Sequence, residues 1–260
     1  MFKAVIKGKS GSVRSDIENK TIEPKRIGFE IPSIREDVLT AAIFTRLSYL
    51  PAAKFWDILC RLYPVLPYRE LVILKNIEFW PYWRHPGKDR KSVEPDIFLQ
   101  FEVGDPKTSI DLLIEIKRYE NWTPQSFQQH IDQISGYYTN MDDAFDSGNS
   151  LFFLALGGLG NQPKSQMKLL EEHVIPGVKD VSESEFSKSH IGGTSWKKLS
   201  GVISNCLVEW DEPNKFILND LIEILNHAGF TNRRYFADKQ PIELFNYQHA
   251  SLASLYNKAD

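Results

Sequence analysis

Three ionisable residues lie at the adjoining ends of two short apolar runs. Asp96 opens one run, Ile97–Phe101, and Glu115 and Lys117 close the next, Leu112–Lys117. Side chains alternate along a β-strand, so Glu115 and Lys117 share one face. In a hairpin the start of one strand lies beside the end of the next, which predicts that Asp96 meets Glu115. Two carboxylates beside an ammonium group suit a divalent cation that relieves the repulsion between the carboxylates.

Magnesium is the cation expected at such a site, with manganese able to replace it. Mg²⁺ binds a few carboxylate oxygens together with water and phosphate oxygens. The bound ion would polarise a phosphoryl oxygen and lower the pKa of a water, and Lys117 would orient that water and neutralise the growing charge. The predicted chemistry is therefore phosphodiester hydrolysis. The alternative is that Glu115 and Lys117 form a charge pair that only solvates the end of an edge strand.

The pattern Pro95-Asp96 followed by Glu115-Ile116-Lys117 resembles the PD-(D/E)XK nuclease superfamily. The spacing of 19 between Asp96 and Glu115 (115 − 96) and the order helix, three strands, helix, strand are similar to that superfamily's core, over roughly residues 33–157. The resemblance implies a restriction-endonuclease-like α/β fold and a DNA substrate cut to leave 5′-phosphates. It also implies that Asp96 and Glu115 hold the metal and that Lys117 assists the attacking water.

Two residues in the next helical stretch match a feature of RecB-like nucleases. Gln133 and Tyr137 read as QxxxY, and the spacing of four places them on one helical face. The resemblance implies that both belong to the catalytic site, where they brace it or contact DNA. The alternative is a surface glutamine and a core tyrosine.

An acidic residue on the first helix is a further candidate metal ligand. Members of the superfamily often carry one there, and Glu36 occupies that place. A competing explanation is a capping box from Ser33 to Glu36, which would account for the glutamate by helix geometry alone. Asp37 is the other candidate ligand, or a residue that favours the helix N-terminus.

A basic loop precedes the Asp96 strand and is the predicted nucleic-acid contact. Its basic residues are Arg84, Lys88, Arg90 and Lys91, with His85 among them. They would meet a phosphate backbone near the metal, or form a solvated turn. The aromatic residues Trp80, Tyr82 and Trp83 either stack bases or belong to the core. Glu94 is expected outside the metal shell, and Asp111 is expected to solvate a strand edge.

Periodicity predicts three segments: a β-hairpin in 1–32, a core in 33–160 and a helical extension in 161–260 packed on the core. The resemblance implies that the core is the nuclease domain. Within the core we expect a helix from about residue 38 that resumes after Pro51, an antiparallel meander, a helix from Thr123 to about Phe145, and a parallel strand. The meander strands are Ile77–Trp83, Ile97–Phe101 and Leu112–Lys117, and the parallel strand is Leu151–Leu156. The extension is expected to hold helices near Lys164–His173, Trp196–Val208 and Lys215–His227, with Gly229 as the C-terminal cap.

Composition limits the other possibilities. The chain has 260 residues, a formal charge of −3 and two cysteines, Cys60 and Cys206, which we expect to be buried free thiols. No Cys/His cluster favours a zinc site, and no apolar run is long enough for a membrane span. These features predict a cytoplasmic protein whose contact with nucleic acid is local, because a non-specific DNA binder is usually more basic.

The expected partners are DNA and possible further protein subunits of a defence, restriction or mobile-element complex, or a second copy of the chain. The rival hypothesis is a non-catalytic or gated nucleic-acid-binding or assembly subunit with the same fold. In that case the C-terminal helices would dock a partner through Trp196, Leu199, Leu218 and Leu225. The alternative for these four residues is packing onto the core.

Overall fold

The computed structural model describes residues 35–85, 92–118, 122–144, 150–160, 162–181 and 186–230, without the side chains of residues 141–144 and 180–181. The β-hairpin predicted for residues 1–32 lies outside the described residues.

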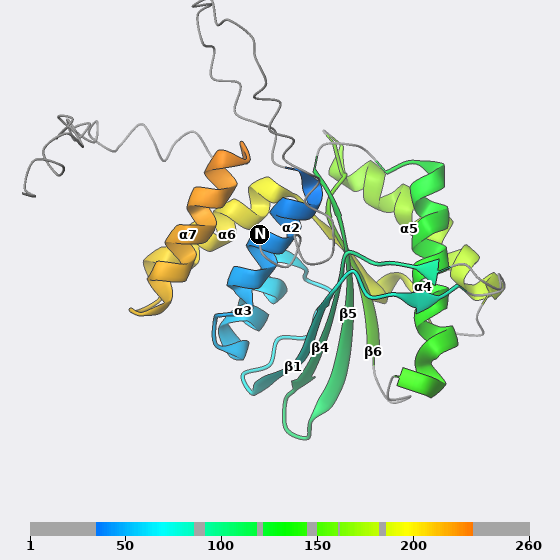
Figure 1. Cartoon of the computed structure of the whole chain (residues 1–260), viewed down its shortest axis with the longest axis horizontal. Helices are drawn as coiled ribbons and strands as arrows, with labels where there is room; N and C mark the ends of the chain where they lie inside the picture. The colour runs from blue at the N-terminus through cyan, green and yellow to red at the C-terminus, as the bar shows by residue number, and fades with distance from the viewer. Residues whose placement is uncertain are drawn as a thin grey trace, which may run out of the picture.

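A five-stranded mixed sheet forms the middle of the molecule (Figure 1), with strand order β1-β4-β5-β6-β7. The strands are β1 (Val72–Phe79), β4 (Ile97–Val103), β5 (Thr108–Lys117), β6 (Ser150–Gly157) and β7 (Ile191–Thr194). β1, β4 and β5 pair antiparallel, whereas β6 is parallel to both β5 and β7. The predicted meander and the predicted parallel strand are confirmed. The fully apolar β6 lies inside the sheet, as a strand covered on both faces should.

Six helices cover the sheet in the described part of the chain. They are α2 (Glu36–Leu47), α3 (Ala52–Leu62), α4 (Pro124–Ala144), α5 (Pro163–Val181), α6 (Trp196–Glu209) and α7 (Asn214–His227), with a short 3₁₀ helix, η1 (Lys188–His190). Figure 1 shows α4 and α5 on one side of the sheet and the other four helices on the opposite side. The result is a layered α/β fold in which both sheet faces carry helices.

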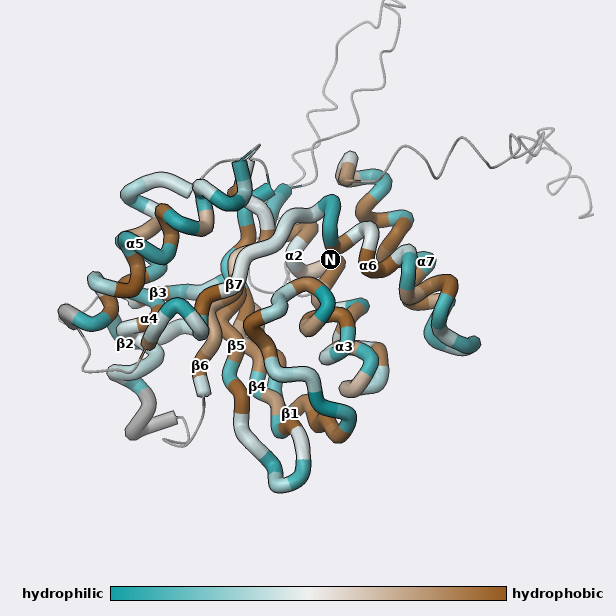
Figure 2. Tube along the Cα trace, turned by 180° about the vertical axis from the view of Figure 1, so that it is seen from behind, coloured by the Kyte–Doolittle hydropathy of each residue, from teal (hydrophilic) through white to brown (hydrophobic). Residues whose placement is uncertain are grey.

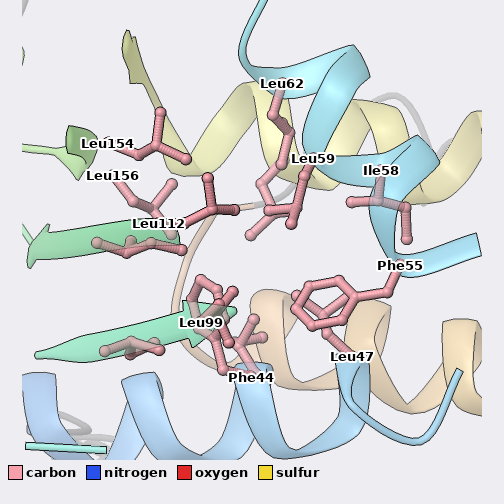
Figure 3. Packing of buried hydrophobic residues seen from close by; sticks show 14 of the residues in the cluster. Phe44, Leu47, Phe55, Ile58, Leu59, Leu62, Leu99, Leu112, Leu154 and Leu156 are labelled. Carbon is pink, nitrogen blue, oxygen red and sulfur yellow. The ribbon is translucent and has the colours of Figure 1, made fainter. Parts of the chain in front are cut away.

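The larger core lies between the sheet and helices α2 and α3. Leu99, Leu112 and Leu154 point from the strands toward Phe44 of α2 and Phe55 of α3 (Figure 3), and all five side chains are buried. A second core on the other face packs α4 and α5 against Phe98, Leu113 and Phe153, among others. Figure 2 shows hydrophobic residues concentrated where the strands run side by side in the middle of the molecule, with hydrophilic residues interspersed. Because side chains alternate between the two faces of a strand, β4 and β5 each contribute residues to both cores.

The α4 helix begins as predicted. Pro124 is its first residue, and the Thr123 hydroxyl accepts a hydrogen bond from the backbone N–H of Ser126 at 3.2 Å. This is the arrangement expected of a threonine cap before an N-terminal proline. The cap fixes where α4 starts and hence which of its residues face the sheet.

One strand of the sheet lies in a region that was expected to be a loop within the helical extension. Residues 191–194 form β7, which pairs with β6 and adds a fifth strand within the predicted helical extension. The sequence there, Ile-Gly-Gly-Thr, is too short and too glycine-rich to show a strand period. Its glycines have a packing reason: a Cβ on Gly193 would stand 2.0 Å from the Met167 sulfur of α5.

The first meander strand is offset from its predicted range. β1 covers Val72–Phe79 and ends where Trp80 adopts a φ of +50°. Trp83 instead begins a separate two-stranded sheet of β2 (Trp83–Arg84) and β3 (Ser92–Val93). Trp80 and Trp83 are 2% and 8% exposed, so they are core aromatics, whereas Tyr82 is 76% exposed. Of the three proposed base-stacking residues, only Tyr82 is presented to solvent.

The C-terminal helices pack onto the core. Trp196, Leu199, Leu218 and Leu225 are each at most 3% exposed and belong to the larger core. This outcome agrees with the alternative that they pack within the molecule. Gly229 follows α7 with a φ of +83°, as expected for a C-terminal cap residue.

The two cysteines are free thiols. Cys206 is buried and Cys60 is partly buried. Burial raises the pKa of Cys60 to about 12 and that of Cys206 to about 11. Within the described residues, no helix has the length and apolar character needed to cross a membrane.

Candidate functional site

Asp96 and Glu115 meet at the end of the β4–β5 hairpin. Ile97 pairs with Ile114, so the next position outward places Asp96 beside Glu115. The backbone N–H of Asp96 donates to Glu115 Oε1 at 3.1 Å, and the N–H of Ile116 donates to Asp96 Oδ2 at 2.8 Å. Each strand thus supplies a backbone donor to the carboxylate of the other. The hairpin register expected from the sequence is the one observed.

The two carboxylates share a poorly hydrated environment. Glu115 is only 1% exposed, and Asp96 is half-buried. Burial raises the pKa of Asp96 to about 7, against the lowering effect of the Ile116 N–H and the Lys117 ammonium. Burial, and then the negative charge of Asp96, raise the pKa of Glu115 well above its ordinary value. The pair therefore resists full ionisation unless positive charge is brought to it.

Lys117 is held by Glu36, the first residue of α2. Its Nζ lies 3.1 Å from Glu36 Oε1, and the backbone N–H of Arg118 donates to Glu36 Oε2 at 2.7 Å. Burial lowers the pKa of Lys117, but Glu36, Asp96 and Glu115 together outweigh burial, and the net shift is upward. Lys117 therefore carries its charge at the edge of the carboxylate pair.

Glu36 does not owe its place to a capping box. Helix α2 begins at Glu36 itself, with Arg35 at the N-cap and no side-chain cap hydrogen bond there. Ser33 lies outside the described residues. The Glu36 carboxylate is occupied by Lys117 and the Arg118 N–H, which explains the residue by contact across the layers.

Glu36 was predicted to be a third metal ligand, but its carboxylate contacts Lys117 and the Arg118 N–H. The described residues contain no group of three or more His, Cys, Asp or Glu side chains placed to hold one metal ion. Glu36 and Asp37 are nevertheless near enough for their charges to raise the pKa of Asp96. Glu36 therefore belongs to the site because it binds Lys117, and Asp37 belongs to it because its negative charge raises the pKa of Asp96.

Gln133 reaches the site from α4 on the other side of the sheet. Its Nε2 donates to Glu115 Oε1 at 2.6 Å and to the Glu94 carbonyl at 3.3 Å. The side chain is fully buried. Glu94 thus contributes its backbone to the site, in keeping with the expectation that its carboxylate lies outside it.

Tyr137 binds another acidic residue of β5. Its hydroxyl donates to Asp111 Oδ2 at 2.8 Å, and Gln100 Nε2 donates to the other oxygen at 3.3 Å. Asp111 is 0% exposed, so the expectation that it solvates a strand edge is wrong. The two halves of the QxxxY pattern therefore bind two different acidic residues of β5, Glu115 and Asp111.

The backbone of Lys117 is fixed from two sides. Trp196 of α6 donates its indole N–H to the Lys117 carbonyl at 2.9 Å. On β6, Gly157 has a φ of +81°, and a Cβ there would stand 1.9 Å from the same carbonyl oxygen. Glycine is required at this position both by the backbone conformation and by the close approach of the strands.

The basic loop is only partly within the described residues. Arg84 is exposed on β2, and its carbonyl accepts from Asn140 of α4 at 3.1 Å. Lys88, Arg90 and Lys91 lie outside the described residues. His85, at the start of the loop, contacts Asp132 of α4 at 3.1 Å, which ties the base of the loop to the helix that carries Gln133.

The contacts that three residues make at or beside the site were not predicted from the sequence: those of Trp196, Asp111 and His130. His130 Nδ1 lies 3.3 Å from Gln133 Oε1. A signal for His130 was present, since residues three apart on a helix share a face. Trp196 and Asp111 contact residues far away in the chain, and no local spacing marks such contacts.

The chain is similar in sequence to a protein of Pasteurella multocida. The chain is 30% identical to an uncharacterized protein of Pasteurella multocida (strain Pm70) over 189 residues, which cover 72% of this chain and 67% of that protein. No established family profile matches the chain, and no solved structure matches it. The extent and identity of the match show that the chain belongs to the same family as this Pasteurella multocida protein.

Proposed function

We propose that this protein is a magnesium-dependent nuclease that hydrolyses DNA phosphodiester bonds, with a restriction-endonuclease-like core of the PD-(D/E)XK type. The observation that carries the proposal is the Asp96–Glu115 pair, in which the Asp96 N–H donates to Glu115 Oε1 and the Ile116 N–H donates to Asp96 Oδ2. Lys117 lies two residues beyond Glu115 on the same strand. A structural charge pair at a solvated edge does not explain why Glu115 is buried.

The residues present suit a divalent cation of the magnesium type. The donors are carboxylate oxygens, which Mg²⁺ prefers, and burial together with mutual repulsion disfavours two negative charges unless a cation is near. Asp96 and Glu115 would hold the ion, and water and substrate phosphate would complete its shell. When bound, the ion supplies polarisation of a phosphoryl oxygen and acidification of a water.

Other residues of the site would orient the water and hold the metal-binding carboxylates in place. Lys117, kept charged and oriented by Glu36, would hold the attacking water and stabilise negative charge on the phosphoryl group. Gln133 binds Oε1 of Glu115, so Oε2 would be the oxygen that faces the cation. Trp196 and Gly157 both lie against the Lys117 carbonyl and so fix the position of the strand end that carries Lys117.

The DNA substrate and the biological setting extend the same proposal. With a formal charge of −3, the chain would bind DNA through a local surface, for which the loop beginning at Arg84 is the candidate. Cleavage would leave a 5′-phosphate. A role in defence, restriction or transposition, with partner subunits or a second copy of the chain, is the setting that such an activity suits.

A cleavage assay tests the proposal directly. Purified protein would be incubated with plasmid and with linear DNA in Mg²⁺, in Mn²⁺ and in chelator, beside the variant Lys117→Ala. Lys107→Ala is the matched control, because Lys107 is 62% exposed at the opposite end of the same hairpin and pairs with Glu102. We expect metal-dependent cutting by the wild type and by the control, and a loss of at least 100-fold in Lys117→Ala.

Other outcomes are equally informative. Cutting that persists unchanged in Lys117→Ala would refute the assignment of the site. If no form of the protein cuts DNA but all forms bind DNA or a protein partner, the chain is a non-catalytic binding or assembly subunit.

A further inference from the structure

A buried histidine lies directly behind the proposed site. His130 is on α4, three residues before Gln133, and is 0% exposed. Its ring packs against Trp122, with ring centroids 4.6 Å apart, and against Phe153 at 4.9 Å. Its one hydrogen-bond contact among the described residues joins Nδ1 to Gln133 Oε1 at 3.3 Å.

The direction of that hydrogen bond follows from the partners of Gln133. The amide contacts Glu115 Oε1 and the Glu94 carbonyl at one end and His130 at the other. A backbone carbonyl only accepts hydrogen bonds, so the NH₂ end of the amide must face Glu94 and Glu115. The Gln133 oxygen then faces His130, and His130 Nδ1 must carry the proton.

The surroundings of the ring agree with a single neutral tautomer. Within the described residues His130 Nε2 has no hydrogen-bond partner, so a proton there would be a buried donor left unsatisfied. Burial lowers the pKa of His130 to about 3, against the raising effect of Gln133. The ring is therefore uncharged and donates from Nδ1.

We propose that His130 is a positioning residue of the nuclease site: its Nδ1–H holds the Gln133 amide so that the NH₂ end faces Glu115. This inference deepens the proposed function and rests on it for the role of Glu115. If the amide turned over, its oxygen would face the Glu115 carboxylate and the Glu94 carbonyl, and three acceptors would be brought together. The histidine makes that arrangement unfavourable because it offers the amide oxygen a donor on the far side.

The tautomer is measured on the wild-type protein without any assay of activity. Nitrogen-15 NMR of the histidine rings distinguishes Nδ1–H from Nε2–H, and His130→Phe assigns the resonance. We expect the neutral Nδ1–H form at pH 6. An Nε2–H or a charged ring would overturn the inference.

Metal affinity then separates positioning from packing. Mn²⁺ binding would be measured by calorimetry on wild type, His130→Phe, His130→Asn and the control His173→Phe, whose ring is exposed on α5. His130→Phe keeps the aromatic packing but loses the donor, whereas His130→Asn keeps an N–H donor but leaves a gap. We expect Mn²⁺ affinity to fall about 10- to 100-fold in His130→Phe and to recover in His130→Asn.

The thermal stabilities of the same variants should rank the other way. His130→Phe should melt above His130→Asn because it fills the ring's space. If affinity and stability rank in the same order, or if His130→Phe binds Mn²⁺ like wild type, His130 serves packing alone and the inference is refuted. If wild type binds no Mn²⁺, the proposed function fails, and the tautomer alone decides whether His130 orients Gln133.

Discussion

Tyr137 donates its hydroxyl to Asp111 at 2.8 Å, one helical turn beyond the Gln133 that binds Glu115. Asp111 is fully buried, so Tyr137→Phe removes a donor that water does not replace. We expect the free energy of unfolding to fall by about 1 to 3 kcal/mol. Urea denaturation measures the change.

The control for this substitution is Tyr82→Phe. Tyr82 is 76% exposed, and loss of its hydroxyl should change the free energy of unfolding by less than about 0.5 kcal/mol. Equal effects of the two substitutions would mean that the Tyr137–Asp111 contact does not anchor α4 to β5.

Glu36→Gln should separate two roles for the first-helix acidic residue. Glutamine keeps an acceptor for the Arg118 N–H but removes the charge that holds Lys117. Because Lys117 would then be less well oriented, we expect DNA cleavage to slow about 10- to 100-fold while Mn²⁺ affinity changes little. A large loss of Mn²⁺ affinity in calorimetry would instead make Glu36 a metal ligand.

Asp96→Asn should stabilise the metal-free protein at neutral and alkaline pH. The folded-state pKa of Asp96 is raised from its ordinary 3.8 to about 7. Its contribution to stability is therefore fully present below about pH 4 and is lost as the pH rises to 7. Asparagine does not titrate and still accepts from the Ile116 N–H.

The size of this effect is modest because Asp96 is only half-buried. A full shift would give about 1.4 kcal/mol per pKa unit, and solvent screening reduces this to a gain of about 1 kcal/mol at pH 8. Denaturation in chelator at pH 4 and pH 8 tests it. The expectation fails if the variant is less stable than wild type at pH 8, or if the difference is independent of pH.

Gly157→Ala should disrupt the strand end that carries Lys117. The added Cβ would stand 1.9 Å from the Lys117 carbonyl oxygen, at a φ of +81°. We expect a loss of at least about 2 kcal/mol in the free energy of unfolding. Urea denaturation and near-ultraviolet circular dichroism would follow the fold and the environment of Trp196.

Gly201→Ala is the matched control. Gly201 lies within α6, and a Cβ there meets no described atom within 4 Å. Alanine should raise the free energy of unfolding by about 0.5 to 1 kcal/mol, because it restricts the unfolded chain and favours the helix. A neutral Gly157→Ala would show that β5 and β6 separate at this end more easily than the structure indicates.

Much of the site was predictable because its key residues follow local rules. Alternation along β5 places Glu115 and Lys117 on one face, and hairpin geometry brings in Asp96. Helical spacing groups Gln133 with Tyr137. These inferences need only the period of one element or the pairing of two neighbours.

What the sequence did not reveal depends on distant partners. Asp111 looks like a solvated residue until Tyr137 is placed over it, and Trp196 looks like an ordinary core aromatic until its indole meets the Lys117 carbonyl. β7 was missed because four residues with two glycines give no period, and it exists only by pairing with β6. The choice between a capping role and an inter-layer role for Glu36 likewise required the position of Lys117.

Residues from helices on both sides of the sheet contact the end of β5, and the ribosome makes these helices at different times. Glu36 arrives early from α2, Gln133 comes later from α4, and the partner of the Lys117 carbonyl is Trp196 of α6. A nascent chain that still lacks α6 would contain Asp96, Glu115 and Lys117 but not Trp196, whose indole N–H holds the Lys117 carbonyl. Any hydrolytic activity of the protein should therefore emerge only after α6 has been synthesised and both helical layers have docked.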